Sequence, residues 1–530
     1  MNTTGRPTQP ADTETHNEAK VTNTGNKALQ IAEPLIFEFA DFSGTGVDLP
    51  EAEGRRTRLG GMERTDPIGL PGVSEPEAMR HFVRLSQKNY AIDMGPFPLG
   101  SCTMKHNPRL NEKIARVPGF ADIHPLQPQS TVQGALGLID QLAHWLKSLT
   151  GMPAVAMSPK AGAHGELCGM MAIRAAIEAK GEAETRNRVL APESAHGTNP
   201  ATAAQCGFKV DSIPADATGR VDLDALRAKL GPDVAGIMVT NPNTCGLFER
   251  DIRAIADAVH DVGGYFYCDG ANFNAIAGKA RPGDLGVDAM HINLHKTFST
   301  PHGGGGPGSG PTVLSAALAP FAPIPYVVHD GQGFSLVETR RAAAGDEGHT
   351  EGSQSFGRMT AFHGQMGMFV RALAYMLSHG VDGIRQASED AVLNANYVMA
   401  RLRTEMTSTF DGYCMHEALF DDRFLKDTGV ETIDFAKAMI DEGYHPMTMY
   451  FPLVVRGAML IEPTESESKR ELDQFCDALL SLARKAKEPS NNEMFKAAPV
   501  FAPFRRLDET AAARKPKLRW TPEEMLEAAE

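Results

Sequence analysis

The chain has 530 residues, a formal net charge of -14 at pH 7, 42% hydrophobic residues, 51 glycines and 35 prolines. This length allows two or more domains with a large buried core, and the many glycines and prolines indicate tight turns rather than a long helical bundle. The negative charge argues against general nucleic-acid binding, because no excess of cations is available to displace counterions from phosphates.

Cysteine usage and the absence of long apolar segments predict a cytoplasmic protein. Seven scattered cysteines without a CxxC pair favour reduced thiols over a disulfide framework or a zinc site. Residues 1–30 are polar and lack the apolar run of a secretory signal, so we expect a disordered tail there. No run of about eighteen apolar residues occurs, and we therefore expect no transmembrane helix and no membrane partner.

An N-terminal segment with an active-site loop is expected over residues 31–125. The loop, residues 93–105, reads DMGPFPLGSCTMK. Its Pro, Gly, Ser and Thr residues predict a rigid backbone with several hydrogen-bond donors, which is costly to bury unless it faces a ligand or a partner. A simple connector between N-terminal elements is the alternative interpretation.

Residues 126–330 are expected to form a large cofactor-binding α/β domain. Apolar residues at spacings of three and four predict an amphipathic helix over 130–150 that ends at Gly151. After it, short apolar runs that predict strands alternate with helical patterns: strands at 153–157, 188–191, 234–240, 264–268 and 287–292, and helices at 166–180, 222–230 and 250–262. Such alternation is typical of a mostly parallel sheet that helices cover on both faces.

Polar or small residues follow four of these predicted strands, at 160–166 (KAGAHGE), 193–199 (ESAHGTN), 241–244 (NPNT) and 269–272 (DGAN). Any one of these segments is compatible with an ordinary turn or helix cap. Ligands bind beyond the carboxyl ends of parallel strands, so the shared position of the four segments indicates a composite site.

Beyond about residue 330 the pattern changes to longer helices with short strand-like segments between them. Helices are predicted at 357–379, 387–404 and 466–486, and strands near 412–419 and 447–461. This arrangement predicts a small C-terminal α+β domain over residues 331–530.

Lys296 follows the last predicted strand of the large domain and precedes a glycine-rich run, residues 302–310. A lysine at such a place suggests an amine used in chemistry, because the backbone beside it allows a ligand to approach closely. Asp269 ends another apolar strand, so its carboxylate needs a cationic or N–H partner. The structural alternatives are a surface lysine and an aspartate in a helix cap or a salt bridge.

The turn Ala161-Gly162-Ala163 is suited to a phosphate, because small residues expose backbone N–H groups at the positive end of a helix dipole. His164 follows and can stack on a flat aromatic ligand, with capping or packing as its alternative. A phosphate turn, a carboxylate and a reactive lysine at one sheet edge together indicate pyridoxal phosphate. The lysine would form a Schiff base, and the aspartate would keep the ring nitrogen protonated.

Two competing motifs are excluded. Gly303, Gly305 and Gly308 match GxGxxG, but Pro307 and Pro311 prevent the helix that a dinucleotide site requires after its glycines. The pair at 416–417 lacks the second histidine of an HExxH zinc site. We therefore expect neither a dinucleotide site nor a metal site.

Long stretches of the chain resemble the P-protein family, the pyridoxal-phosphate component of the glycine cleavage system, in its lysine-bearing subunit 2 form. They include DMGPFPLGSCTMKHNP (93–108), AGAHGEL (161–167), SAHGTNPATA (194–203), CDGANFNAIAGKARPGDLG (268–286), HINLHKTFSTPHGGGGPGSGP (291–311) and YFPLVVRGAMLIEPTESES (450–468). The resemblance runs from about residue 60 to about residue 520 and leaves out the N-terminal tail.

The resemblance implies the aminotransferase-like fold, fold type I of pyridoxal-phosphate enzymes, and a set of site residues. Lys296 would form the Schiff base, Asp269 would pair with the pyridine nitrogen, and His164 would lie against the ring. The other implied cofactor-binding residues are Ala161, Gly162, Ala163, Asn243, Ala271, His295 and Thr297, with His196 as a weaker candidate.

The activity that the resemblance implies is that of glycine dehydrogenase (aminomethyl-transferring), an oxidoreductase of glycine catabolism. It would decarboxylate glycine, release carbon dioxide and transfer the aminomethyl group to the lipoyl arm of the H protein. A partner, subunit 1, is also implied, in a heterotetramer of two copies of each subunit. The alternatives are another pyridoxal-phosphate lyase or aminotransferase with a different amino-acid substrate, and a noncatalytic half that only supports its partner.

Overall fold

The computed structural model describes residues 33–39, 58–65, 70, 72–302, 308–339, 351–361, 363–502 and 504–519. The expected tail and residues 303–307 of the glycine-rich run lie outside the described residues. Two compact units are present, one from residues 1–94, 440–443 and 493–530 and the other from residues 95–439 and 444–492. The domain boundaries expected from the sequence stay a prediction. Among the described residues, none of the helices combines the length and the apolar character needed to cross a bilayer.

The smaller unit contains α2 (Ile36–Phe39), α3 (Glu75–Gln87) and α16 (Glu509–Arg514). Ser74 and Glu77 form a capping box at the start of α3, where the Ser74 N–H donates to Glu77 Oε2 at 2.8 Å. The buried carboxylate of Glu33 accepts from Arg84 Nε at 2.6 Å. This hydrogen bond, more than any other contact, lowers the pKa of Glu33 to about 2 and ties the residue to α3.

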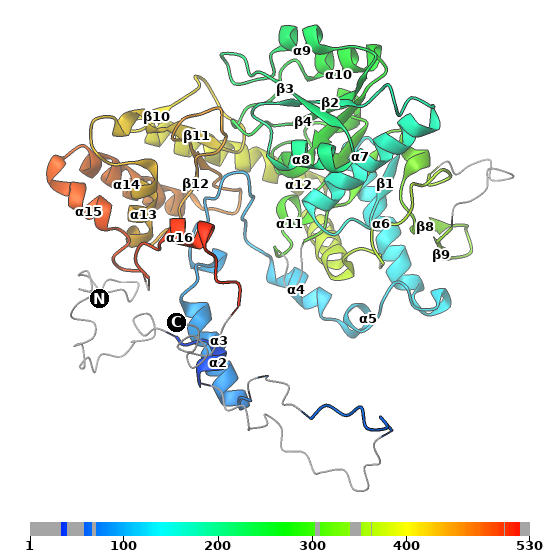
Figure 1. Ribbon diagram of the computed structural model, residues 1–530, viewed down its shortest axis with the longest axis horizontal. Helices are drawn as coiled ribbons and strands as arrows, with labels where there is room; N and C mark the ends of the chain where they lie inside the picture. Colours follow the sequence, from blue (N-terminus) through cyan, green and yellow to red (C-terminus); the bar gives the residue numbers. More distant parts are fainter. Residues whose placement is uncertain are drawn as a thin grey trace. The chain divides into compact units, whose positions relative to one another are not determined.

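The larger unit is built on a seven-stranded sheet with the order β1-β7-β6-β5-β4-β2-β3 (Figure 1). Its strands are β1 (Ala154–Ala156), β2 (Arg188–Pro192), β3 (Lys209–Ile213), β4 (Val234–Thr240), β5 (Tyr265–Asp269), β6 (Ala289–His291) and β7 (Thr312–Leu314). Neighbouring strands in the part of the sheet with the order β6-β5-β4-β2-β3 are parallel to one another. Strand β7 runs antiparallel to both β1 and β6. The predicted mostly parallel sheet is therefore confirmed.

Two of these strands were absent from the sequence prediction. Strand β3 is at the edge of the sheet and exposes most of its residues, so it carries no apolar run. Strand β7 is only three residues long and follows the glycine-rich run. Neither segment shows the continuous apolar run from which the other five strands were predicted.

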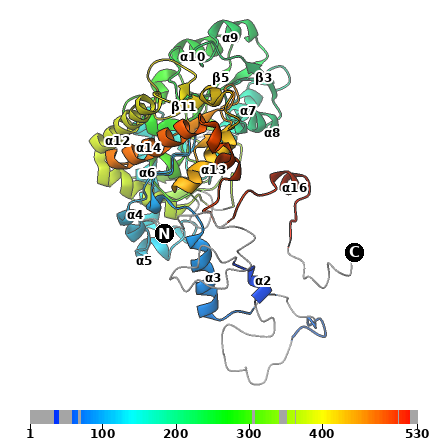
Figure 2. The same cartoon turned by 90° about the vertical axis from the view of Figure 1, so that its left-hand side faces the viewer.

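Helices cover both faces of the sheet. They are α6 (Gln133–Thr150), α7 (Gly162–Ala179), α8 (Thr198–Gln205), α9 (Leu223–Lys229) and α10 (Ile252–Asp261). Helices α7 and α8 pack on one face, and α6 and α10 on the other. Helices α9 and α10 lie side by side in both views (Figure 1, Figure 2). The predicted end of α6 is confirmed, because Gly151 follows it in the left-handed conformation, with a φ of 68°.

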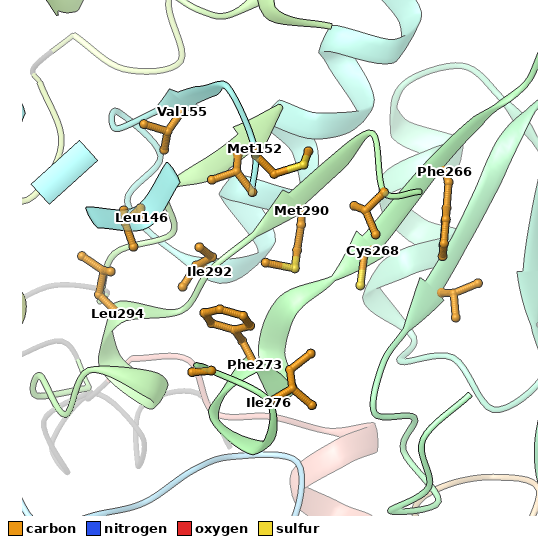
Figure 3. Packing of buried hydrophobic residues seen from close by; sticks show 14 of the residues in the cluster. Leu146, Met152, Val155, Phe266, Cys268, Phe273, Ile276, Met290, Ile292 and Leu294 are labelled. Atoms are coloured by element: carbon orange, nitrogen blue, oxygen red, sulfur yellow. The ribbon is translucent and has the colours of Figure 1, made fainter. Parts of the chain in front are cut away.

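Alternate residues of β5 enter different hydrophobic cores. Tyr265 and Tyr267 pack with α7, whereas Phe266 and Cys268 pack in the cluster shown in Figure 3, where Phe266 lies on the same face as Met290 of β6. Both faces are therefore buried, and the strand reads as a continuous apolar run. This double burial makes the central strands rigid supports for the residues at their ends.

The C-terminal part of the larger unit combines long helices with a four-stranded antiparallel sheet of order β10-β11-β13-β12. The strands are β10 (Thr407–Ser408), β11 (Ala418–Asp421), β12 (Thr448–Met449) and β13 (Met459–Ile461). Helix α12 (Met366–Leu402) contains a break at Gly380, which explains the prediction of two helices, and it packs against α14 (Lys469–Ala486) (Figure 2). The strand predicted near 412–419 was placed too early, because β11 begins at Ala418.

The remaining elements surround these two sheets. They are α4 (Arg109–Ala115), α5 (Pro118–Ala121), α11 (Leu294–Thr297), the hairpin of β8 (Tyr326–His329) and β9 (Phe334–Val337), and most of α13 (Thr432–Glu442). Helix α15 (Asn492–Ala497) belongs almost entirely to the smaller unit. Helix α11 is a single turn that directly follows β6 and carries Lys296. The fold thus places the lysine at the carboxyl edge of the parallel sheet.

Truncation of a core side chain on β5 should destabilise the larger unit. Phe266→Ala removes a fully buried ring, and we expect it to lower the free energy of unfolding by about 3–5 kcal/mol. Leu393→Ala on α12 is the control, because Leu393 is 65% exposed, and its effect should stay within about 0.5 kcal/mol. Urea denaturation followed by circular dichroism measures both, and equal effects would contradict this account of the core.

Candidate active site

A cavity of about 110 Å³ lies where β4, β5 and β6 end and α7 begins. It contains six of the residues that the sequence predicted for the site, with the weaker candidate His196 included. Its lining consists of Ser101, Gly162, Ala163, Glu166, His196, Thr198, Thr240, Thr244, Asp269, Ala271, His291, Asn293 and Lys296. A larger, more open groove of about 930 Å³ runs past Asp421 and Arg456 and shares none of these residues. The smaller cavity is therefore the candidate active site.

Lys296 lies on α11 and is only 8% exposed. Its Nζ donates to the backbone carbonyl of Ser101 at 2.8 Å, so the loop predicted at the active site does reach the lysine. The loop is fixed by a second buried lysine, Lys105, whose Nζ donates to Thr297 O at 2.8 Å and to Glu465 Oε1 at 2.5 Å. The amine of Lys296 is thus held between α11 and the loop.

Asp269 ends β5 and is 4% exposed. Its Oδ1 accepts from the Ala271 N–H at 2.9 Å. With its amide nitrogen turned toward the carboxylates, Asn199 donates to Asp269 Oδ2 at 3.1 Å and to Glu166 Oε1 at 2.9 Å. Burial, with the charge of Asp269, raises the pKa of Glu166 to about 9. Glu166 is therefore protonated at neutral pH, and Asp269 is the carboxylate available to a cationic ligand.

Glu166 and His291 are site residues that the sequence prediction missed. Glu166 lies in the first part of α7 and is a buried acidic residue within an otherwise apolar helix face, a signal that was available in the sequence. His291 closes β6, where its Nε2 lies 3.6 Å from Asp269 Oδ1 and its Nδ1 lies 2.6 Å from the Tyr267 hydroxyl. In the sequence it resembles an ordinary core histidine on an apolar strand. Only its contacts with Asp269 and Tyr267 in the structure identify it as a site residue.

The start of α7 has the features of an anion site. Ala161 occupies the N-cap position, and within the described residues no side chain caps this end. Gly162 and Ala163 line the cavity, and a side chain at Gly162 would place Cβ 2.6 Å from Asn293 Nδ2. Free N–H groups at a helix N-terminus bind phosphate well, so this end of the cavity suits a phosphate group.

Two histidines compete for the place beside a flat ligand. His196 lines the cavity, its Nδ1 lies 2.8 Å from Thr198 Oγ1, and its ring meets Phe451 edge-on. His164 is not part of the cavity lining within the described residues. Its Nδ1 accepts from the Lys160 N–H at 3.3 Å, and partial burial lowers its pKa. The stacking role expected for His164 stays a prediction.

Asn243, His295 and Thr297 also lie outside the cavity lining, as judged from the described residues. Asn243 donates to Gly219 O at 2.9 Å and to Glu249 Oε1 at 2.7 Å, bonds that hold its own loop. His295 accepts from the Ser309 N–H at 3.3 Å, and burial lowers its pKa to about 3. Thr297 is buried beneath Lys105. Their roles toward a cofactor stay predictions.

The residues around the cavity fit pyridoxal phosphate. When the cofactor is bound, the uncapped helix end would hold its phosphate, the buried carboxylate of Asp269 would pair with its protonated ring nitrogen, and the amine of Lys296 would bond to its aldehyde carbon. Within the described residues, Thr240 Oγ1 and Asn293 Oδ1 are buried without a partner, and both residues line the cavity. A polar ligand would supply partners for these atoms.

Comparison with known proteins identifies two families within the chain. The family described as "Glycine dehydrogenase, C-terminal domain" matches residues 387–502, and "Aminotransferase class-V" matches residues 169–305. The "Probable glycine dehydrogenase (decarboxylating) subunit 2" of Caulobacter vibrioides is 66% identical over 524 residues, 98% of each chain. The protein of the same name from Desulforamulus reducens is 48% identical over 93% of this chain and 100% of its own.

Solved structures share the fold at low sequence identity. A "glycine decarboxylase (P-protein) of the glycine cleavage system, in inhibitor-bound form" is similar with a TM-score of 0.66, 20% identity, and coverage of 80% of this chain and 93% of that chain. "Oryza sativa TDC with PLP and tryptamine" is similar with a TM-score of 0.60, 13% identity, and coverage of 84% and 94%.

These similarities confirm the family and the fold type that the sequence motifs predicted. The structural neighbours support the fold, and the near full-length relatives establish the family. With 66% identity to a relative over 98% of both chains, and with the fold of pyridoxal-phosphate-dependent enzymes, the chain belongs to the glycine dehydrogenase (decarboxylating) subunit 2 family.

Proposed function

We propose that the chain is the lysine-bearing subunit of a glycine-decarboxylating enzyme. It binds pyridoxal phosphate covalently through Lys296, removes carbon dioxide from glycine, and passes the aminomethyl group to the lipoyl arm of the H protein. The observation that carries the proposal is the meeting of Lys296, Asp269 and the uncapped start of α7 at one cavity. The names of the close relatives support glycine as the substrate.

Each part of the cofactor has a partner in the cavity lining. Gly162 and Ala163 would hold the phosphate, Asp269 the ring nitrogen, and Lys296 the aldehyde carbon. We favour His196 over His164 for the face of the ring, because His196 lines the cavity together with Asp269. When bound, the cofactor supplies an electron sink for the bond that breaks at the substrate Cα.

The cavity is suited to a substrate whose carboxylate must leave. Within the described residues, no arginine belongs to the lining, so no bidentate ion pair would stabilise the substrate carboxylate in the ground state. An enzyme that keeps its substrate carboxylate intact gains from such a pair. This observation favours decarboxylation over amino-group transfer to a keto acid, the competing reaction for this fold.

The proposal includes partners beyond the chain itself. The relatives are named as subunit 2, which supports a subunit 1, and we propose an assembly of two copies of each. The lipoylated H protein would be the acceptor. A different pyridoxal-phosphate lyase remains the second candidate, because the residues around the cofactor place would serve both reactions equally.

Replacement of Lys296 tests the covalent bond. Lys296→Ala should abolish the visible absorbance that pyridoxal phosphate acquires when it is bonded to a lysine, because no other amine lines the cavity among the described residues. Lys279→Ala is the control, since Lys279 is a surface residue paired with Glu389. Absorbance spectroscopy after dialysis measures both, and an unchanged spectrum in Lys296→Ala would remove this lysine from its role.

Replacement of the two histidines tests the ring contact. His196→Ala should weaken the affinity for pyridoxal phosphate by several-fold to about tenfold, because one aromatic stacking contact is lost. His164→Ala should leave the affinity nearly unchanged. Fluorescence titration of the cofactor-free protein gives both dissociation constants. The reverse order of effects would restore His164 to the place expected from the sequence.

Isotope exchange tests the reaction itself. The chain, combined with subunit 1 and lipoylated H protein, should exchange the labelled carboxyl carbon of glycine with bicarbonate, because decarboxylation is reversible. Omission of H protein or replacement of glycine by alanine should reduce the exchange strongly. If the complete mixture shows no exchange while the visible absorbance is intact, the chain binds the cofactor but acts on another amino acid.

A further inference from the structure

Two glutamates are buried side by side behind the active-site loop. Glu417 directly precedes β11 and Glu462 directly follows β13, and they are 0% and 1% exposed. The antiparallel register pairs Ala418 with Ile461, so Glu417 and Glu462 occupy the next opposed positions. Two like charges at opposed positions are unfavourable in water and more so in a buried site.

Each carboxyl group uses one oxygen to hold the loop that contacts Lys296. Glu417 Oε1 accepts from the Ser101 N–H, and Glu462 Oε1 accepts from Thr103 Oγ1 at 2.5 Å. The Oε2 atom of each glutamate is buried and has no partner in the described part of the chain. One carboxyl oxygen of Glu417 and one of Glu462 lie within 4.8 Å of each other. A proton between them would give both second oxygens a partner.

The charges that face the pair come from both sheets and from the loop. Lys105 is paired with Glu465 at 2.5 Å, and Lys296 acts electrostatically on both carboxyl groups, lowering the pKa of each. Burial, together with Lys296, lowers the pKa of His416 to about 3, so this ring is neutral. The neighbouring thiols are neutral as well, because burial raises the pKa of each: Cys102, Cys245 and Cys414. One proton on the pair makes the cluster neutral.

The pKa shifts of Glu417 and Glu462 agree with one proton on the pair. Burial, and then the charge of Glu462, raises the pKa of Glu417 well above its usual range. Burial also raises the pKa of Glu462, to about 7, while Thr103 and Lys296 act in the opposite direction. At neutral pH Glu417 therefore keeps its proton and Glu462 is the more easily ionised member. A divalent cation in place of the proton would add charge to a cluster that already contains two lysines.

We infer that Glu417 and Glu462 share a single proton, and that the pair carries one negative charge that faces Lys296 while it holds Ser101 and Thr103 above the lysine. Both glutamates are positioning residues, since they act on the reactive amine through the loop and through their charge. The inference rests on the proposed function for the importance of Lys296. It adds that the glutamate pair can take up or release a proton when the charge on the Lys296 nitrogen changes.

The shared proton has a signature that two independent carboxyl groups lack. Glu417→Gln replaces the protonated member, so Glu462 stays ionised. Glu462→Gln removes the negative charge beside Glu417, which then ionises opposite Lys296. The net charge of the pair stays at minus one in both variants. Only the double replacement removes the charge. Glutamine has nearly the shape of a protonated glutamate, so the single variants retain the packing of the site.

Infrared spectroscopy of the cofactor-free protein near pH 7.5 tests the proton directly. The wild type should show the carbonyl band of a buried protonated carboxyl group, and Glu417→Gln and Glu462→Gln should each lose it. Glu166→Gln is the matched control, because this separate buried acid has a band of its own that should disappear only in that variant. A band that persists in both single variants, or that is missing from the wild type, would overturn the inference.

A pH titration of the visible absorbance of the cofactor-loaded protein tests the charge. A negative charge near the lysine nitrogen favours its protonated form, so the double variant Glu417→Gln/Glu462→Gln should titrate at a pH lower by about one unit or more. Each single variant should titrate close to the wild type, whereas a full shift in a single variant would contradict a shared proton. One tightly bound divalent cation per chain, lost in Glu462→Gln, would also overturn it.

The two tests separate this inference from the proposed function. If the wild type acquires no visible absorbance with pyridoxal phosphate, the proposed function fails, and the infrared result on the cofactor-free protein still decides the shared proton. If the absorbance appears and the infrared band does not respond to either single variant, the proposed function stands and the inference fails.

Discussion

A lysine amine that is removed from water needs partners for its protons and its charge, and this requirement shapes the environment of Lys296. Its Nζ meets the carbonyl of Ser101, a partner from a loop almost 200 residues away in the chain. The loop in turn depends on Lys105, which is buried and donates to α11 and to Glu465. Two buried lysines therefore hold one loop against one helical turn, and the amine of each donates to oxygen atoms of the protein.

The two sheets of the larger unit place different groups around Lys296. The parallel sheet presents side chains in the direction of its strands, with Asp269 at the end of β5 and Lys296 just after β6. The small antiparallel sheet presents Glu417 and Glu462 from opposed strand ends. Polar groups for the ligand thus come from one sheet, and the counter-charge for the amine comes from the other.

The sequence predicted the parallel core well because its central strands are buried on both faces. Alternate residues of β5 enter two cores, so the whole strand is apolar and its carboxyl end is easy to locate. Lys296 and Asp269 could be found in this way, since both directly follow such strands. Strand β3 could not, because an exposed edge strand has no such pattern.

The glutamate pair escaped prediction for a different reason. Glu417 and Glu462 come from strands only a few residues long, and their pairing depends on a register that no local pattern specifies. Glu417 was considered only as part of a zinc motif and excluded on that ground.

His164 and His196 show that the same short motif can have different positions relative to the cavity. Both His164 and His196 stand in the triplet Ala-His-Gly, in the segments that follow β1 and β2 of the seven-stranded sheet. In the first triplet the helix has already begun at Gly162, so the backbone N–H groups face the cavity and His164 contacts Lys160 instead. In the second triplet α8 begins only at Thr198, and His196 precedes it and lines the cavity. A difference of four residues in where a helix begins relative to the histidine therefore separates the ring that lines the cavity from the ring that does not.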